Sequence, residues 1–411
     1  MSSVRIYQTN PYCKDTVCEV INVIQKNNKD VVVTDKSVFF PEGGGQPSDT
    51  GTITLNGIVY EVTYAYDNSL EDDVYHETSA PAGTFKAGDK VELAINWDSR
   101  YVNMQRHCGE HMLSGAFYNL YGGVNKGFHM GADYIAIDID LNGRILTSEE
   151  ISSAEDSVNE AIRNNLPVEV RFFDSYEASK IMPVRKDVPH DGKVSVVTIG
   201  DTAAPYDCIA CCGTHPSTTA EVGLVAVYKS EPNKGMTRIY FDCGRLAIEK
   251  LKHDYATLTS IANSLSTSND GVPHKLEIQA QREADFKGRL ALLSTYYKDK
   301  EQASMTAAIK EKRSNGSRVH SFDNDILDVN DLLKLGFAMC DSLEDVELLT
   351  LRDIPSHTVL LLSKGKDIKC GDIAKNIAPQ FDGRGGGRPD NARVAFKSAE
   401  DAKAFIEHLS K

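Results

Sequence analysis

The sequence predicts an α+β protein in four parts: a small β-barrel over residues 1–95, a mixed α/β domain over 96–247, a helical arm over 248–314 and a small α/β domain over 315–411. Two observations lead to this prediction. A chain of 411 residues is too long for one typical globular domain. The spacing of apolar residues also changes along the chain, from the pattern of strands to the three-to-four-residue step of helices.

The first part is rich in β-branched and aromatic residues. Runs such as "VVVTDKSVFF" and "TGTITLNGIVYEVTYAY" are separated by Asn, Gly and Asp, which favour turns. A small barrel or a sandwich fits this pattern, and we expect the barrel.

The second part begins with one amphipathic helix, in "NWDSRYVNMQRHCGEHMLSGAFYNLYG". A second helix is expected over residues 148–165, because Thr147 or Ser148 before Glu150 forms a capping box. Four strand-like runs complete a mixed α/β unit, namely "VEVRFF", "VSVVTIG", "LVAVYK" and "TRIYFDCG".

The arm is expected to be two helices on either side of "STSNDGVP", as an extended arm or as an antiparallel hairpin. The favoured interpretation of this arm is a packing or dimerisation element that carries no catalytic residues. In the last part "HTVLLLSK" predicts a strand and "SAEDAKAFIEHL" predicts a helix.

Charge and composition exclude several classes of protein. A net charge of −14 argues against indiscriminate binding to nucleic acid, so we expect no DNA partner. The first residues lack an apolar stretch of signal-peptide length, and no segment reaches the roughly 18 apolar residues of a membrane span. We therefore expect a cytoplasmic protein that does not bind membranes. Nine scattered cysteines make a disulfide framework unlikely and favour metal ligands or core residues.

Two pairs of residues have the spacing of metal ligands. His107 and His111 lie four apart on the first predicted helix, so their imidazoles share one face. Cys211 and His215 repeat this spacing inside "CIACCGTH". A single HxxxH fits a core or surface histidine equally well, and Cys208 with Cys211 also has the spacing of a redox pair or a zinc ribbon. One thiolate with three imidazoles is a set that zinc accepts, so both pairs together favour one zinc site.

A glycine-rich loop, "FFPEGGGQPSDTG", lies between two predicted strands. That context, and the absence of Lys-Ser or Lys-Thr after the glycines, exclude the Rossmann and P-loop motifs. Gly43, Gly44 and Gly45 are expected to let the backbone approach a ligand or another element, while Gln46 presents an amide. A tight loop at the edge of the barrel is the alternative.

The order and approximate spacing of "FFPEGGGQPSDTG", "RHCGEHML", "TIGDTAAPYDCIACCGTHPSTTAEVG" and "TRIYFDCG" resemble the free-standing alanyl-tRNA editing proteins, the AlaX family, and the editing domain of alanyl-tRNA synthetase. "GRGGGRPDNARVAF" resembles the glycine-rich segment of the synthetase's C-terminal domain, so the long form of the family is implied. The resemblance implies a hydrolase that deacylates mischarged tRNA(Ala), chiefly the seryl ester and secondarily the glycyl ester. It implies one Zn²⁺ per chain, held by His107, His111, Cys211 and His215.

The resemblance also implies roles for residues around the zinc. The family has a threonine hydroxyl before the aromatic pair, where this chain has Ser37. Gln46 and Asp207 are expected to contact substrate, and for Asp207 a role in orienting a ligand histidine is equally plausible. Cys212 stands where the family has glycine, and a silent small side chain is favoured over a second ligand or an oxidation-prone thiol. Cys208 and Cys108 are not expected to be ligands.

The C-terminal domain is expected to bind tRNA or to dimerise. Arg384 and Arg388 flank three glycines, which would bring guanidinium and backbone groups onto tRNA phosphates. The arm or this domain is also the candidate contact of a homodimer. The alternative to an enzyme is a tRNA-binding or assembly module with a structural zinc. Phosphoesterase activity is excluded because the Asp-rich metal motif that such enzymes need is missing.

Overall fold

The computed structural model describes residues 3–68, 73–186, 192–313, 318–343, 346–364 and 367–410. It divides into two compact units, Met1–Ser260 and Ile261–Lys411. The fold is mixed α+β, as the sequence predicts. In the part of the chain that the structure describes, we find no helix with the length and apolar character of a membrane span.

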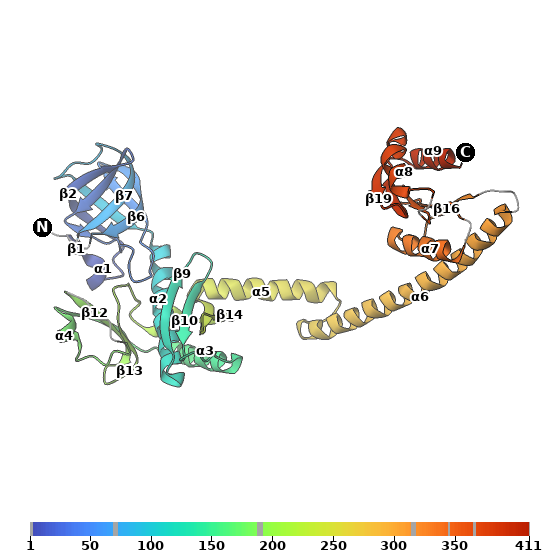
Figure 1. The fold of residues 1–411 in the computed structure, drawn as a ribbon. Coiled ribbons are helices and arrows are strands. Elements are labelled where there is room, and N and C mark those ends of the chain that lie inside the picture. The colour runs from blue at the N-terminus through green and yellow to red at the C-terminus, as the bar shows by residue number, and fades with distance from the viewer. Residues whose placement is uncertain are drawn as a thin grey trace. The chain divides into compact units, whose positions relative to one another are not determined.

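Six antiparallel strands close into a barrel at the start of the first unit (Figure 1, blue). Asn27 and Asn28 adopt positive φ angles of 53° and 59°, which suit the tight turn between the first two strands. Buried apolar side chains such as Val32, Phe39 and Leu93 fill the interior. The strands, in their order around the barrel, are β2 (Asp15–Lys26), β3 (Lys29–Thr34), β7 (Val74–Pro81), β6 (Ile58–Asp67), β5 (Gly51–Leu55) and β8 (Lys90–Ile95). The predicted barrel is confirmed.

Short elements lie at the mouth of this barrel. Strand β1 (Val4–Arg5) pairs in parallel with β4 (Lys36–Ser37), and the single turn α1 (Ile6–Thr9) follows. The segment after α1 carries Tyr12, whose hydroxyl bonds to residues of the α/β region that follows. The N-terminal segment therefore bridges the barrel and the next part of the chain.

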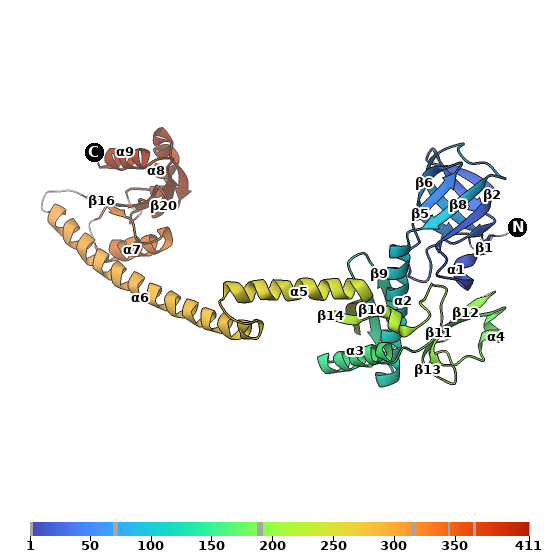
Figure 2. The ribbon, with the colours of Figure 1, turned by 180° about the vertical axis from the view of Figure 1, so that it is seen from behind.

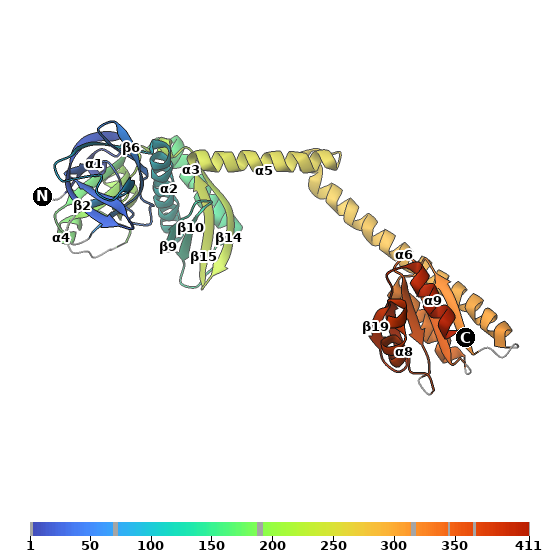
Figure 3. The ribbon, with the colours of Figure 1, turned by 90° about the horizontal axis from the view of Figure 1, so that it is seen from above.

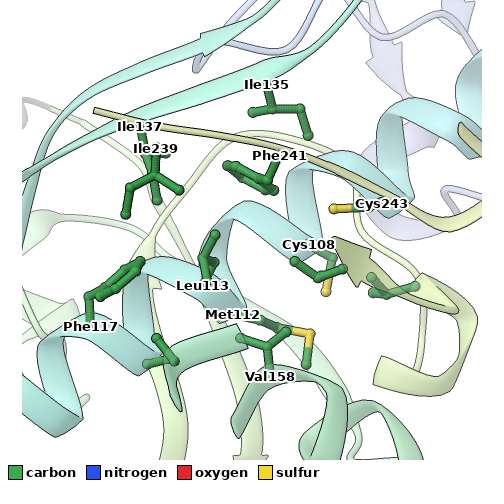
Figure 4. Packing of buried hydrophobic residues seen from close by; sticks show 14 of the residues in the cluster. Cys108, Met112, Leu113, Phe117, Ile135, Ile137, Val158, Ile239, Phe241 and Cys243 are labelled. Carbon is green, nitrogen blue, oxygen red and sulfur yellow. The ribbon is translucent and has the colours of Figure 1, made fainter. Parts of the chain in front are cut away.

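Helix α2 (Trp97–Tyr121) is the long helix that the apolar spacing predicts. The Asn96 side chain caps it by accepting from the backbone N–H of Ser99 at 3.2 Å, and Gly122 ends it with φ +71°. One face of α2 is apolar and packs into the main core of the unit. In Figure 4 Leu113 and Phe117 lie on the side of Ile137, Ile239 and Phe241 from two strands, Cys108 lies beside Cys243, and Met112 lies beside Val158.

Two antiparallel sheets complete the first unit. The larger has the order β14 (Val225–Asn233), β15 (Met236–Cys243), β10 (Ile135–Asp140), β9 (Val124–Met130), and α2 lies against it (Figure 3). The smaller has the order β11 (Val168–Phe173), β12 (Val194–Asp201), β13 (Ala204–Ala210). Helix α3 (Ser148–Arg163) begins with the predicted capping box between Thr147 and Glu150. The remaining short elements are α4 (Tyr176–Ser179) and η1 (Thr219–Val222).

Two helices occupy the predicted arm. Helix α5 (Gly244–Ser264) and helix α6 (Val272–Arg313) are separated by the short turn η2 (Asn269–Gly271), which lies in the predicted break. The division between the two compact units falls near the end of α5. The four-part domain division stays a prediction.

The second unit contains a five-stranded sheet with helices on both faces (Figure 2). Helix α7 (Val329–Ser342) packs on one face, and α8 (Cys370–Asn376) and α9 (Ala399–Leu409) pack on the other. The strand order is β16 (Val319–Asn324), β17 (Leu348–Asp353), β18 (Thr358–Leu362), β20 (Asn391–Ala395), β19 (Arg384–Gly387), and η3 (Ala378–Phe381) precedes β19. The glycine-rich segment therefore forms the edge strand of this sheet.

Candidate metal centre

Four side chains from two distant segments converge beside the barrel. His107 and His111 project from α2 and share one face of it. Cys211 and His215 follow the end of β13. One potential ligand atom from each of the four residues lies within 4.8 Å of the others. The structure thus brings together the tetrad that the spacing predicts.

The four groups face one another at short range. Sγ of Cys211 lies 3.3 Å from Nε2 of His107 and 3.7 Å from Nε2 of His215. The ring centroids of His107 and His215 are 4.8 Å apart, and those of His111 and His215 are 5.1 Å apart. All four side chains are in reach of one small ion.

Gln46 determines the tautomer of His107. Its amide oxygen accepts from Nδ1 of His107 at 2.9 Å and from the backbone N–H of Thr214 at 3.1 Å. A backbone N–H can only donate, so the atom facing the backbone nitrogen of Thr214 must be the amide oxygen. The amide nitrogen then donates to Oγ1 of Thr214 at 2.9 Å. Because Nδ1 carries the proton, Nε2 of His107 offers a lone pair toward Cys211. Gln46, predicted as a substrate contact, is therefore placed to orient a ligand.

The glycines around this group permit close packing. A Cβ on Gly213 would lie 2.2 Å from the ring of His107, so only glycine fits there. Gly45 has φ +82°, and a Cβ on it would meet the ring of Phe128 at 2.5 Å. Gly43 and Gly44 approach Sγ of Cys212. The glycine loop comes close to another element of the protein, one of the two outcomes expected for it.

Glu110 lies beside the tetrad and was missed by sequence reasoning. Its Oε2 lies 3.2 Å from Nδ1 of His111, and its Oε1 accepts from Ser114 at 2.6 Å and from Asn125 at 2.8 Å. Burial raises the pKa of this carboxyl above its usual range. Its position next to a ligand in HxxxH was the one signal available in the sequence.

The tetrad fits a divalent metal. Nε2 of His111 is buried without a hydrogen-bond partner among the residues that the structure describes, an arrangement that is costly unless another group is bound. Burial lowers the pKa of His107 to about 4 and that of the other two histidines below their usual range, so the imidazoles are neutral, as metal binding requires. Three nitrogens and one sulfur form a donor set that zinc takes in tetrahedral geometry.

Asp207 belongs to a buried charged cluster. Its Oδ1 accepts from Nε of Arg185 at 2.6 Å, while its Oδ2 is buried without a hydrogen-bond partner in the described residues. Burial raises the pKa of Asp207 to about 7, the Arg185 guanidinium opposes this shift, and the Glu110 carboxylate adds to it. The carboxyl group also packs beside Gly115 of α2, where a Cβ would lie 3.1 Å from its Cγ. Asp207 therefore pairs with an arginine, a partner that sequence spacing could not reveal.

Ser37 is buried in the barrel, and its hydroxyl both donates and accepts a hydrogen bond. It donates to Nε2 of His76 at 2.8 Å and accepts from the backbone N–H of Phe39 at 3.0 Å. Nδ1 of His76 donates to the carbonyl of Val32 at 2.8 Å, so Nε2 is the accepting nitrogen. Ser37 is fully buried, and contact with a substrate would require its hydroxyl to exchange one of these partners.

The other cysteines of this region divide by exposure. Cys108 is buried in the main core and Cys208 packs in the small cluster between β12 and β13, as expected for residues that are not ligands. Cys212 is exposed. These placements leave Cys212 as the accessible thiol nearest the tetrad.

A cavity of about 330 Å³ opens next to the tetrad. His215, Thr214 and Cys212 line one side of it, and the segment around Tyr12 lines another. Val170 and Phe172, half exposed on β11, add an apolar wall. A cavity of this volume is large enough for a ligand of nucleoside size, and its polar end lies next to the tetrad.

Arg384 and Arg388 lie exposed at the two ends of the edge strand in the second unit. Gly385 and Gly387 pack against the backbone of β20 so closely that a Cβ would lie 2.0 Å and 2.2 Å from carbonyl oxygens there. Two of the three glycines are therefore needed for strand pairing, while Gly386 has open space beside it.

Comparisons with known proteins agree with the sequence resemblance. Residues 12–99 match a family model of class II (A) tRNA synthetases, and residues 194–240 match the second additional domain of threonyl and alanyl tRNA synthetases. The chain is 34% identical over 249 residues to alanyl-tRNA editing protein AlaX-L of Pyrococcus horikoshii, which covers 60% of this chain and 59% of that protein.

Longer relatives match nearly the whole chain. It is 28% identical to the alanine–tRNA ligase of Pyrococcus abyssi over 99% of this chain and 43% of the ligase. It is 27% identical to the ligase of Leptospira biflexa over 92% of this chain and 46% of the ligase. The chain thus spans less than two thirds of the length of each of these relatives.

Proposed function

We propose, from the premise that the chain is a relative of the alanyl-tRNA editing proteins and of the matching part of alanine–tRNA ligases, that it deacylates tRNA(Ala) mischarged with serine or glycine. The observation that carries this proposal is the tetrad of His107, His111, Cys211 and His215 at the border of a nucleoside-sized cavity. The cavity admits the terminal aminoacyl nucleoside, and the tetrad would hold one Zn²⁺.

An aminoacyl ester is activated, so its hydrolysis needs mainly a placed water and stabilisation of negative charge on the carbonyl oxygen. A bound zinc would supply Lewis acidity for this purpose. The protein's own residues position the reaction. Gln46 holds the tautomer of His107, and the close approach of Gly213 keeps this part of the loop packed against the His107 ring.

Thr214 is the residue of the cavity wall best placed to recognise a substrate oxygen. Its Oγ1 accepts from Gln46, which leaves the hydroxyl proton for a group in the cavity. A site that bonds the serine hydroxyl selects against alanine, because the smaller side chain leaves the partner unpaired. We assign this selection to Thr214.

The second unit supplies contacts to the body of the tRNA. Arg384 and Arg388 are exposed at the ends of an edge strand, and a guanidinium binds phosphate without reading sequence. Such contacts would add affinity for tRNA in a protein whose net charge is −14.

Deacylation assays test the proposal. The full-length protein is incubated with seryl, glycyl and alanyl esters of tRNA(Ala), and the released amino acid is measured. The metal content of each protein is measured separately. We expect release of serine and glycine but little alanine, and loss of both zinc and activity in Cys211→Ala and His107→Ala. Thr214→Val should reduce the preference for serine over alanine about tenfold or more.

A module without turnover is the second candidate, because four protein donors form the closed set that is typical of structural zinc. Under this alternative the wild type would bind zinc and tRNA but release no serine. That result would overturn the hydrolase.

A further inference from the structure

Three half-buried aromatic rings lead away from the cavity. Tyr12, which lines the cavity, packs against Trp97 with 5.9 Å between ring centroids and a tilt of 41°. Trp97 packs against Tyr101 at 5.5 Å with a tilt of 31°. Trp97 and Tyr101 in turn line a second hollow of about 210 Å³ at the start of α2. The rings thus form a continuous aromatic surface from one hollow to the other.

One carboxylate holds the ends of this surface in place. The hydroxyl of Tyr12 donates to Oε1 of Glu221 at 2.7 Å, and the hydroxyl of Tyr101 donates to Oε2 of Glu221 at 3.2 Å. The backbone N–H of Ser217, which also lines the cavity, donates to the Tyr12 hydroxyl at 2.7 Å. Rings held in this way lose little conformational entropy when a ligand stacks on them.

Two cations accompany the rings. Nζ of Lys14 lies 4.8 Å from the centroid of Trp97, and Arg245 lines the second hollow. Aromatic faces next to Lys and Arg are the features that bind unpaired nucleic acid, because every base has a face that stacks and every nucleotide carries a phosphate. The long Lys14 side chain can yield the Trp97 face to a base and keep its charge near a phosphate.

We infer that Tyr12, Trp97 and Tyr101 form a stacking track for the unpaired 3′ end of a tRNA. This inference rests on the proposed function, because that function places the terminal aminoacyl nucleoside in the cavity. The bases that precede the terminal nucleoside must then leave the cavity, and the aromatic track begins at its wall. Trp97 and Tyr101 are positioning residues that align the ester without touching it.

The single tryptophan of the chain makes a direct binding test available, since all tryptophan fluorescence comes from Trp97. The full-length protein is titrated with an RNA hairpin that ends in a few unpaired 3′ nucleotides, and with the same hairpin carrying a blunt end. Stacking should quench the fluorescence with the unpaired end only. Equal quenching by both hairpins, or none by either, would overturn the track.

Kinetics separate a positioning role from a structural one. Trp97→Leu and Tyr101→Leu should each raise KM for mischarged tRNA about tenfold, the change that ~1.4 kcal/mol of lost stacking produces, with kcat within about twofold. Hydrolysis of seryl-adenosine, which has no further bases, should not change. Trp97→Phe should restore most of the affinity. Tyr255→Leu, which removes an exposed tyrosine of α5, is the matched control.

The two ideas fail in different ways. If the wild type releases no serine but the unpaired end still quenches Trp97 selectively, the proposed function fails and the track stands. If serine is released but Trp97→Leu impairs seryl-adenosine and mischarged tRNA equally, the rings only pack the barrel against α2, and the track is wrong.

Discussion

Two buried histidine sites in the first unit are built in opposite ways. At the barrel site both nitrogens of His76 bond within the chain, to Ser37 and to the carbonyl of Val32. At the tetrad, Nε2 of His111 is buried with no hydrogen-bond partner among the described residues. The first site has both ring nitrogens paired, whereas the second leaves a buried nitrogen that a bound group would satisfy. Both histidines are buried, so burial does not distinguish them. They differ in whether the ring nitrogens have hydrogen-bond partners: both nitrogens of His76 do, and Nε2 of His111 has none among the described residues.

Lowering the pH should reduce the stability of the barrel through His76. Burial lowers the pKa of His76 from its ordinary value of 6.5 to about 4, and the bond to Val32 opposes the shift. The unfolded chain therefore takes up this proton first as pH falls. The stability from the neutral imidazole is complete above pH 6.5 and is lost as pH falls toward 4. Over that window the loss is ~3 kcal/mol.

His76→Gln isolates this effect, since glutamine does not titrate and all other groups are shared. Urea unfolding of both proteins with chelator present, followed by Trp97 fluorescence, should show the wild type losing ~3 kcal/mol relative to the variant between pH 7 and pH 4. A constant difference across this range would mean that the pKa of His76 is the same in the folded and unfolded states.

Gln46→Ala should weaken the tetrad without touching a ligand. With the bond to His107 lost, the imidazole is free to change tautomer and orientation, and metal affinity should fall ten- to a hundredfold. Competition with a chelator measures this, with Gln380→Ala, in the second unit, as the control. Unchanged metal affinity with a raised KM would instead make Gln46 the substrate contact that the sequence suggests.

Ser37→Ala should affect only the scaffold. It leaves Nε2 of His76 and the backbone N–H of Phe39 without their partner, so the free energy of unfolding should fall by ~1–2 kcal/mol. Metal content and the preference for serine over alanine should stay at wild-type values. A lost preference with unchanged stability would restore Ser37 to the role that the family resemblance implies.

Features set by neighbouring residues could be predicted from the sequence. The barrel strands, the long helix with its histidine pair and the capping box at Thr147 all depend on short-range spacing. The four residues of the tetrad could also be predicted as one group. Two pairs with the same spacing, together with the family resemblance, left few other combinations of ligands.

Partnerships between distant residues could not be predicted in this way. Gln46 meets Thr214 across 168 positions and His107 across 61, and Arg185 meets Asp207 across 22. No local pattern encodes such contacts, because they arise only when segments far apart in the chain pack together. The sequence therefore predicts which residues can bind a metal or a substrate, but not which residues orient them.

Two adjacent cysteines, Cys211 and Cys212, are expected to differ in the same way as the two histidine sites. Substitution of Cys212 should have the smallest effect of the changes considered. Cys211 belongs to the tetrad, while Cys212 is exposed and faces the glycine loop, where a Cβ on Gly44 would lie 2.9 Å from its sulfur. Cys212→Ser should keep the metal and change deacylation by less than about twofold, whereas Cys211→Ser should lose the metal. Iodoacetamide should label Cys212 first in the metal-loaded protein, because it is exposed whereas metal would hold the Cys211 sulfur. Equal loss of metal from both variants would make Cys212 a ligand and the tetrad incomplete.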